Sequence, residues 1–466
     1  METRRTLFFA VFLAYFLLAA GYVDTIDASA SIESAKALVE RGSFAVIDKG
    51  ATPFLYYVKD GKAYSKLGLT HTLLYLLPVL LGKWFSPWLV NETVAIAFFV
   101  SLVNPIITAL IVALLFTFFR NQNQSTKVSL TLSLFAGFAT LLFPYSKTCH
   151  REPLHALLLV GIYQITSRPT SPKMRELIIC GFVFMAAILS KVTLMVPLFA
   201  VLIWVWRRYR TLGKQWYLTI VSFIVVTFAG LVGFWKGVVN AETWTGYSAR
   251  VNWWDRSTAW NYPFWRGIWE QWFAEEAGLF WYSPLLIVVP VVAVIKVMNR
   301  KWSWLESSLV LAILGQTVVH ASWFSPTGSG PLGPRYLVAV IPLMVMLLHG
   351  IDWELIFKWP QRLPLVLLCL MGILAQSLYV FVKPNQYASL KYEVQKKGIK
   401  RDYEPQWRLG WKFFIHKLSG KEERYPDYFM GKAIHSEEET NGVVDLRSYR
   451  TLQGFNFWWV HLRRYR

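Results

Sequence analysis

Two aspartates that follow the first apolar run of the chain are the acidic side chains best placed for chemistry. Asp24 and Asp27 are three residues apart, so they would share one face of a helix. A carboxylate at the outer mouth of a helix bundle can act as a general base. Both also resemble helix caps, because Asp24 precedes Thr25 and Asp27 precedes a run of helix formers, 28–40. We favour the capping role for Asp24 and leave both roles open for Asp27.

Basic side chains in or beside apolar sequence form a second candidate group. Lys191 stands between two apolar runs, and Arg335 follows the rigid turn Gly333-Pro334. Neither has a carboxylate close in sequence, and a buried cation needs an anion. A phosphate would serve, since arginine binds one through two parallel hydrogen bonds. The alternative is that each side chain reaches from a helix end to the membrane interface. The remaining members of this basic group are Lys66, Lys147 and Arg151.

Glu152 and several histidines accompany these basic residues. Glu152 either pairs with Arg151 or Lys147 in a structural role, or lines a pocket. His71 and His320 also fall near the predicted outer face. A lone histidine is more often a hydrogen-bonded packing residue, so we predict no metal site from them.

Long apolar runs must position these side chains. The hydrophobic fraction is 55%, above the roughly 45–50% of globular domains. About 20 apolar residues cross a hydrocarbon core ~30 Å thick, and such a run must be helical to satisfy its own backbone. The sequence therefore predicts an all-α polytopic membrane protein with about eleven transmembrane helices. The predicted spans are 6–22, 93–119, 128–145, 153–166, 176–190, 192–206, 216–236, 279–297, 305–321, 336–350 and 363–382.

The formal net charge of +20 sets the orientation of these spans. Lysine and arginine gather in short connections between apolar runs, where they favour the cytoplasmic side, so we predict no nucleic-acid binding. The clusters are Arg4-Arg5, 120–127, 168–175, 207–214, 296–301 and 358–362. The N-terminus is then cytoplasmic. The first run is predicted to be a retained transmembrane helix, because no convincing signal-peptide cleavage site follows it.

The region 69–85 is predicted to be a juxtamembrane helix. It is short, Pro78 interrupts it, and counting it as a span would place the later basic clusters outside. The transmembrane domain is then 1–382, with a first extracytoplasmic loop at 22–68 and a tail at 383–466. The tail is basic and aromatic, and helical spacing predicts a short amphipathic helix within 407–418.

A second long outer loop, 237–278, is rich in tryptophan. Tryptophan favours the membrane–water interface, so this loop could anchor the chain there. Alternatively its rings form a stacking wall for a sugar or a lipid head group.

Five stretches, taken in order, resemble one family of membrane enzymes. They are residues 27–42, where an Asp precedes a helix ending near Gly; Tyr64-Ser-Lys66-Leu-Gly; residues 143–153, with an acidic residue before Pro; Gly278-Leu-Phe-Trp-Tyr-Ser-Pro284; and Gly333-Pro-Arg335-Tyr-Leu. Their order and common outer placement resemble the GT-C superfamily of glycosyltransferases. The nearest branch is family 39, with the protein O-mannosyltransferases and the aminoarabinose transferases of lipid A. The similarity covers residues 1–350.

The resemblance implies a hexosyl- or pentosyltransferase of the plasma (inner) membrane with an extracytoplasmic active site. The donor would be a polyprenyl-phosphate sugar, and the acceptor a lipid, a glycan or a protein. Asp27 would be the base, and Lys66, Lys191 and Arg335 would bind the donor phosphate. Further pocket candidates are Asp24, His71, Lys147, Arg151, Glu152 and Tyr336. No cofactor is required, although a divalent cation is compatible. Ala28 replaces the Glu that often follows the Asp, which argues against the protein mannosyltransferase subtype.

Two other classes remain open at this point. A transporter or flippase of a lipid-linked sugar would need polar residues along the whole bilayer depth, whereas here they gather at one face. A membrane scaffold would show no activity that depends on Asp27. Within the enzyme class, a transferase like the O-antigen ligases would differ in using a pyrophosphate donor.

Overall fold

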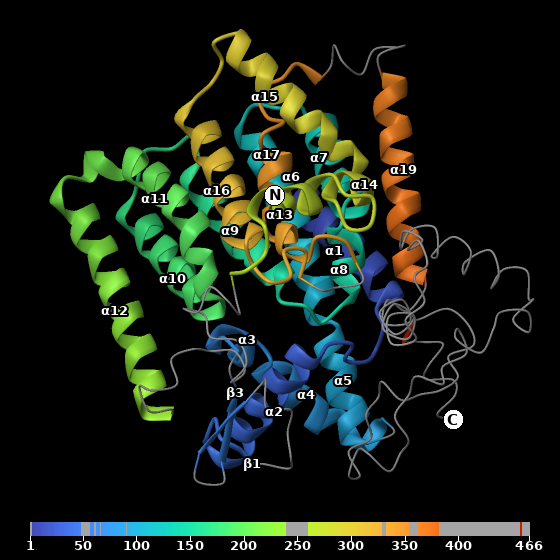
Figure 1. Cartoon of the computed structure of the whole chain (residues 1–466), viewed down its shortest axis with the longest axis vertical. Helices are drawn as coiled ribbons and strands as arrows, with labels where there is room; N and C mark the ends of the chain where they lie inside the picture. Colours follow the sequence, from blue (N-terminus) through green and yellow to red (C-terminus); the bar gives the residue numbers. More distant parts are fainter. Residues whose placement is uncertain are drawn as a thin grey trace, which may run out of the picture.

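Helices dominate the computed structural model (Figure 1). The described residues are 2–47, 56–59, 62–65, 67–89, 91–238, 260–328, 332–353, 362–381 and 457–458.

Helix α6 (Val103–Asn121) lies at the centre of the bundle and is buried along most of its length. It packs against α1 (Glu2–Leu18), α7 (Thr126–Phe138) and α9 (Glu152–Thr166). The predicted span 93–119 is broken at Leu102, where α5 (Glu92–Ser101) ends. Pro105 explains the break, because it has no N–H to donate to the Ser101 carbonyl four residues earlier.

A second group of helices packs beside this centre. Helix α10 (Met174–Ser190) contacts α9 and α12 (Lys214–Val238), while α11 (Met195–Tyr209) packs along α16 (Trp304–Ala321). Ser303 and Glu306 form a capping box that fixes the start of α16. His320 lies near the other end of α16.

A third group closes the bundle. It comprises α8 (Leu142–Lys147), α14 (Leu279–Tyr282), α15 (Val288–Met298), α17 (Ile341–Met346) and α19 (Arg362–Phe381). A 3-10 helix, η6 (Arg335–Val340), precedes α17 and packs against α9 and α16. Because η6 is buried from Leu337 onward, it holds Arg335 at the end of the core.

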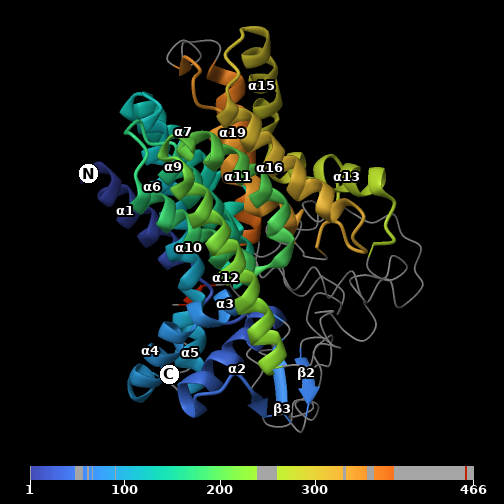
Figure 2. The same cartoon turned by 90° about the vertical axis from the view of Figure 1, so that its left-hand side faces the viewer.

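Four helices and a small sheet form a separate layer at one end of the bundle, seen below it in Figures 1 and 2. The helices are α2 (Ile26–Arg41), α3 (Leu69–Leu74), α4 (Leu76–Phe85) and α5. Thr25 begins α2 as its N-cap, with Oγ1 accepting from the Ala28 N–H at 3.1 Å. Gly42 ends α2 at φ 62°, a conformation that favours glycine.

The sheet departs from the predicted all-α fold. Strands β1 (Val46–Ile47), β2 (Tyr56–Lys59) and β3 (Lys62–Ser65) pair antiparallel in the order β1-β3-β2. Lys59 pairs with Lys62, and the sequence between them is Asp-Gly, which favours a two-residue hairpin loop. That dipeptide, flanked by aromatic and β-branched residues, was the sequence signal for this hairpin.

Helices occupy every predicted span, and the chain is a multi-pass membrane protein. Among the described residues, four helices are long and apolar enough to cross a membrane: Glu92–Asn121, Val192–Leu212, Trp304–Ala321 and Arg362–Val380. Large apolar side chains are exposed along α15 and α19, as expected of lipid-facing helices. The total of about eleven crossings remains a prediction.

The two ends of the bundle differ in the way the charge pattern predicts. The α11–α12 and α15–α16 connections, which carry two of the basic clusters, lie at the end opposite the α2–α5 layer (Figure 1). The predicted juxtamembrane region 69–85 forms α3 and α4 within that layer. The assignment of this layer to the extracytoplasmic side stays a prediction. The predicted tail helix at 407–418, and residues 239–259 of the tryptophan-rich loop, lie outside the described residues.

Candidate active site

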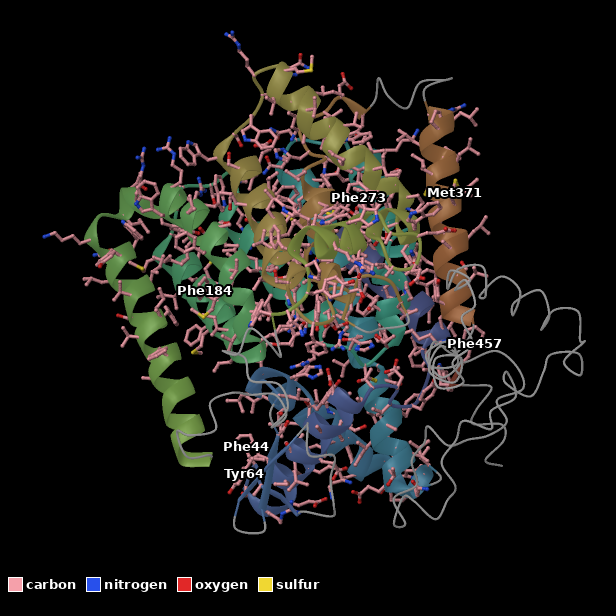
Figure 3. All side chains as sticks on the ribbon, viewed as in Figure 1. Phe44, Tyr64, Phe184, Phe273, Met371 and Phe457 are labelled. Atoms are coloured by element: carbon pink, nitrogen blue, oxygen red, sulfur yellow. The ribbon has the colours of Figure 1, made fainter. Side chains whose placement is uncertain are left out.

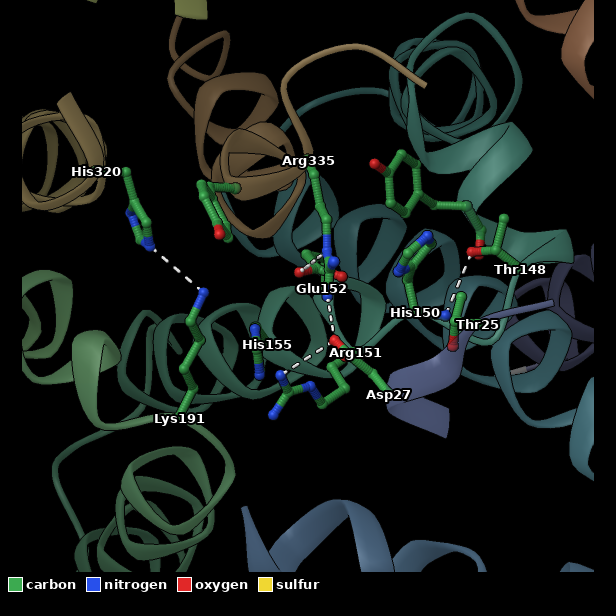
Figure 4. Close-up of polar contacts among 12 residues, drawn as sticks. Thr25, Asp27, Thr148, His150, Arg151, Glu152, His155, Lys191, His320 and Arg335 are labelled. Atoms are coloured by element: carbon green, nitrogen blue, oxygen red, sulfur yellow. Dashed lines mark hydrogen bonds and ion pairs between the residues drawn. The ribbon is translucent and has the colours of Figure 1, made fainter. Parts of the chain in front are cut away.

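Asp27 lies in the first turn of α2, and its carboxylate faces two guanidinium groups (Figure 4). Its Oδ2 accepts from Arg335 Nη2 at 2.8 Å and from Arg151 Nη2 at 3.4 Å. Burial raises the pKa of Asp27, but the charges of Arg335 and Arg151 outweigh burial and hold the pKa below its usual range. Asp27 is therefore an ionised carboxylate whose Oδ2 binds both arginines and whose side chain is 19% exposed.

Arg335 bridges two carboxylates from different helices. Its Nε donates to Glu152 Oε1 at 2.7 Å, while its Nη2 reaches Asp27. Glu152 begins α9, so this one side chain ties η6 to α9 and α2. Of the two roles that the sequence leaves open for Glu152, the ion pair is formed with Arg335 and not with Arg151 or Lys147, while the pocket role stays a prediction. The contact joins residues 183 positions apart, which local sequence cannot indicate.

The turn before Arg335 fixes where the guanidinium points. Gly333 has φ 68°, which favours glycine, and the Arg335 N–H donates to the Thr327 carbonyl at 2.9 Å. A Cβ added at Gly328 would lie 2.9 Å from Arg335 Cβ. The predicted rigid turn at Gly333-Pro334 therefore holds Arg335 against its two partners.

Asn104 on α6 holds the segment that carries Arg151 and Glu152. Its amide donates to the carbonyl oxygens of Thr148 and His150, at 2.6 and 2.7 Å. Asn104 was not predicted as a site residue. The available signal was a buried amide inside an apolar run, which rarely lacks partners.

Asp24 has a different role from the predicted cap. Thr25 caps α2, and Asp24 Oδ1 accepts from the Cys149 N–H at 2.7 Å. Asp24 therefore ties the start of α2 to the 148–152 segment. The capping expectation was wrong because the adjacent threonine occupies the N-cap position.

Lys191 ends α10 and points toward α16 and η6 (Figure 4). Its Nζ lies 3.4 Å from His320 Nε2 and 4.1 Å from the centroid of the Tyr336 ring. His320 Nδ1 lies 2.9 Å from the Gln316 carbonyl and donates to it, which leaves Nε2 as the acceptor for Lys191. The His320 ring also stacks on Tyr336 at 4.0 Å. Burial lowers the pKa of Lys191 to about 7.

Three histidines, His71, His155 and His320, are buried in this part of the structure. His71 is 1% exposed, its ring lies 4.5 Å from that of Tyr75, and burial lowers its pKa to about 3. His155 Nε2 lies 2.9 Å from Ser190 Oγ, which fixes the end of α10 beside α9. His320 was predicted only as a packing residue, and its contact with Lys191 was missed.

Of the remaining predicted basic residues, Lys147 lies away from Asp27 and Arg335, and Lys66 is not among the described residues. Lys147 is buried at the end of α8, where its ammonium group donates to the Val380 carbonyl oxygen of α19. Its Nζ also lies 4.6 Å from the centroid of the Phe457 ring. Lys66, the third predicted phosphate ligand, lies outside the described residues.

The cluster carries more basic than acidic side chains and several unused polar atoms. Arg151, Lys191 and Arg335 face Asp27 and Glu152, so one positive charge is left over in their ionised forms. Within the described part of the chain, Lys191 makes no ion pair with a carboxylate. Arg151 Nε and Glu152 Oε2 are buried there without a hydrogen-bond partner. These features suit a polar, anionic ligand.

An apolar groove of about 1130 Å³ lies further along α16. Its lining includes Trp272, Ile313 and Met344, together with Phe273 and Met371, which Figure 3 labels. Ile313 and His320 are seven residues apart on α16, so the groove and Lys191 are separated by roughly 10 Å along the helix. Thr317 lies between them and accepts from Trp272 Nε1 at 3.3 Å. Ile313 and His320 therefore lie on the same face of α16, about two turns apart.

In the described ranges, no group of three His, Cys, Asp or Glu side chains could hold a metal ion.

Two solved structures are similar to part of this chain. ArnT from Cupriavidus metallidurans, bound to undecaprenyl phosphate, matches with a TM-score of 0.45 and 13% identity, over 84% of this chain and 72% of its own. The apo oligosaccharyltransferase of Archaeoglobus fulgidus matches with a TM-score of 0.46 and 11% identity, over 93% of this chain and 61% of its own. No family model matches the chain, and no curated protein matches it in sequence.

Proposed function

We propose that this protein is a membrane glycosyltransferase that moves a sugar from a polyprenyl-phosphate donor to an acceptor hydroxyl at the extracytoplasmic face. The observation that carries the proposal is Lys191. It is a half-buried amine with a histidine nitrogen and an aromatic ring as neighbours, beside Arg335 and close to an apolar groove. An anionic head group on an apolar chain has the chemistry that this combination favours.

The donor would lie along α16. Its isoprenoid chain would occupy the groove that Ile313 lines, where burying apolar surface favours binding. Its phosphate would lie at the other end, next to Lys191 and Arg335. An arginine offers two parallel hydrogen bonds to a phosphate, and a lysine adds a compact charge.

The reaction would be a single displacement at the anomeric carbon. The acceptor oxygen forms a bond to that carbon while its proton passes to Asp27. The bond from the carbon to the phosphate oxygen breaks, and its electron pair leaves with the lipid phosphate. The transition state has oxocarbenium character, as in glycoside hydrolysis. Lys191 and Arg335 would stabilise the charge that develops on the leaving phosphate.

Donor binding would also change the state of Asp27. Arg335 is shared between Asp27 and Glu152, and a phosphate at Lys191 would compete for the same guanidinium. Weakening the contact at Asp27 would raise the pKa of that carboxylate toward its usual range and make it a better base. The phosphate and the base are therefore coupled through one side chain.

Release of free polyprenyl phosphate tests this proposal. The purified protein, in detergent with lipid, would be offered a panel of polyprenyl-phosphate hexoses and pentoses with candidate acceptors. We expect release by the wild type and a loss of about 100-fold or more in Asp27→Asn, because the acceptor proton has no base. Glu33→Gln is the matched control, since Glu33 is an exposed carboxylate on the same helix. Equal release by Asp27→Asn would remove Asp27 from the mechanism. No release from any donor, with transbilayer movement of the same lipids, would favour the flippase.

A further inference from the structure

Phe457 and Trp458 bring the C-terminal part of the chain back to the end of α1. The Trp458 N–H donates to the Ala19 carbonyl at 2.9 Å, and its indole Nε1 donates to the Phe16 carbonyl at 2.8 Å. The Phe16 carbonyl also accepts from the Ala19 N–H at 3.2 Å, so the indole is its second donor. Ala19 follows the last residue of α1, where carbonyls lack partners within the helix, and the Trp458 N–H supplies one. Its ring lies 5.2 Å from Phe16 and 5.6 Å from Phe98 of α5.

Gly21 lies directly against Trp458, with no room for a side chain between them. It has φ 77°, and a Cβ added there would lie 2.6 Å from Trp458 Cβ. Any side chain at position 21 would therefore displace Trp458. Asp24 and Asp27 follow Gly21 within six residues. Trp458 therefore packs against the start of the segment 21–27, which carries the proposed base.

Phe457 contacts the second segment of the site. It is 4% exposed, and Lys147 Nζ lies 4.6 Å from its ring centroid. In Figure 3 it lies beside the lower end of α19. Lys147 precedes Cys149, whose N–H binds Asp24, and the same segment continues to Arg151 and Glu152. Trp458 therefore contacts the segment that leads to Asp27, and Phe457 contacts the segment that leads to Arg151 and Glu152. These two segments meet at Arg335.

We propose that Phe457 and Trp458 are positioning residues, which hold the Asp27 segment and the Arg151–Glu152 segment in register for sugar transfer. The role rests on the proposed function. Among the described residues, the neighbours of Lys191 and the lining of the groove do not include Phe457 or Trp458, so donor binding should not depend on this pair. A displacement of about 1 Å in a catalytic group can cost on the order of 100-fold in rate. Loss of the pair should therefore lower kcat and leave the donor KM nearly unchanged.

The kinetic test uses the full chain with three variants. Trp458→Ala should lower kcat by about 10- to 100-fold, and Gly21→Ala should do the same from the other side of the contact. Trp458→Phe keeps an aromatic ring and the backbone N–H but loses the indole donor, so it should lower kcat by only about fivefold. Trp88→Ala, which removes a 70% exposed tryptophan, should match the wild type. Wild-type kcat in Trp458→Ala, or a rise in KM alone, would overturn the proposal.

A second readout does not require any transferase activity. Cys149 is buried at the junction of the two segments, and its thiol lies 3.8 Å from the Tyr22 carbonyl oxygen. With Cys180 and Cys369 replaced by serine, alkylation by a maleimide reports this junction alone. We expect at least tenfold faster labelling of Cys149 in Trp458→Ala and Gly21→Ala than in the wild type or Trp88→Ala. Equal protection would overturn the positioning role. Faster labelling in these variants, with no transfer by the wild type, would instead reject the proposed function. It would still show that Trp458 holds the two segments together. If Trp458→Ala is recovered unfolded, Trp458→Phe decides, because the proposal requires its kcat to fall.

Discussion

The contacts of Arg335 show which parts of the site can be predicted from single residues and which depend on the fold. Asp27, Lys191 and Arg335 are each recognisable in the sequence as ionisable groups beside apolar runs. Their pairing is not, because Asp27 and Arg335 are 308 positions apart. The role of His320 was missed for the same reason, since only the fold places it against Lys191. Sequence patterns therefore predicted the chemical groups, and tertiary packing decided which of them meet.

The amine of Lys191 gives a prediction about the pH dependence of the reaction. Burial lowers its pKa to about 7, so in the empty site it is protonated below that pH and neutral above it. A sugar phosphodiester stays anionic across this range. We therefore expect kcat/KM for the donor to fall as pH rises through about 7, because that ratio reports the free enzyme. The measurement is a profile of lipid phosphate release from pH 5.5 to 9 at low donor concentration.

Lys191→Arg is the control for this profile. Arginine keeps its charge throughout the range, so the fall above pH 7 should disappear even if the overall rate is lower. A fall that persists unchanged in Lys191→Arg would assign the titration to another group.

Helix positions followed from the apolar runs, whereas breaks and close approaches did not. The span 93–119 divides at Leu102, and the hairpin at residues 56–65 was missed, although Pro105 and an Asp-Gly dipeptide signalled both. The start of α2 was nearly correct, but the N-cap is Thr25 and not Asp24. Local rules such as these leave open which helices touch, because contact depends on side chains from distant elements.

The approach of α3 to α10 gives a prediction at this scale. A Cβ at Gly68 would collide with the backbone carbonyl oxygens of Leu189 and Ser190, the residues just before Lys191. Gly68→Ala should therefore destabilise the protein by about 1–3 kcal/mol and lower its apparent unfolding temperature by several degrees. The measurement is thermal unfolding in detergent, followed by size-exclusion chromatography.

Gly161→Ala in α9 is the matched substitution. A Cβ at Gly161 meets nothing within 4 Å, and alanine is the better helix former, so this change should be neutral or stabilising. Equal unfolding temperatures for the two variants would show that the α3–α10 contact is looser than described.

At the scale of the whole molecule, the charge pattern predicts which end faces the cytoplasm. The apolar runs predicted where helices lie along the chain, whereas the orientation assigned from the basic clusters stays a prediction. They were not sufficient for the packing around α6, or for the return of Phe457 and Trp458 to α1. Those features depend on contacts between segments separated by most of the chain, such as Trp458 with Phe16.

Single cysteines in a cysteine-free background test the orientation. Glu33 is exposed on α2, and Lys214 is exposed at the α11–α12 turn. We expect a membrane-impermeant maleimide to label Glu33→Cys in intact cells and to label Lys214→Cys only after permeabilisation. The reverse pattern would invert the topology, and labelling of both from one side would contradict a spanning bundle.

The charge imbalance around Arg335 has a kinetic consequence for the proposed reaction. One surplus positive charge matches the single negative charge of a sugar phosphodiester. The spent carrier is a phosphomonoester with about −1.5 to −2 at pH 7, so the same cations hold it more tightly than they held the donor. Release of the lipid phosphate, and not cleavage of the glycosidic bond, would then limit the rate of turnover. Added polyprenyl phosphate would slow the enzyme, and whatever process withdraws that lipid from the membrane would set its rate.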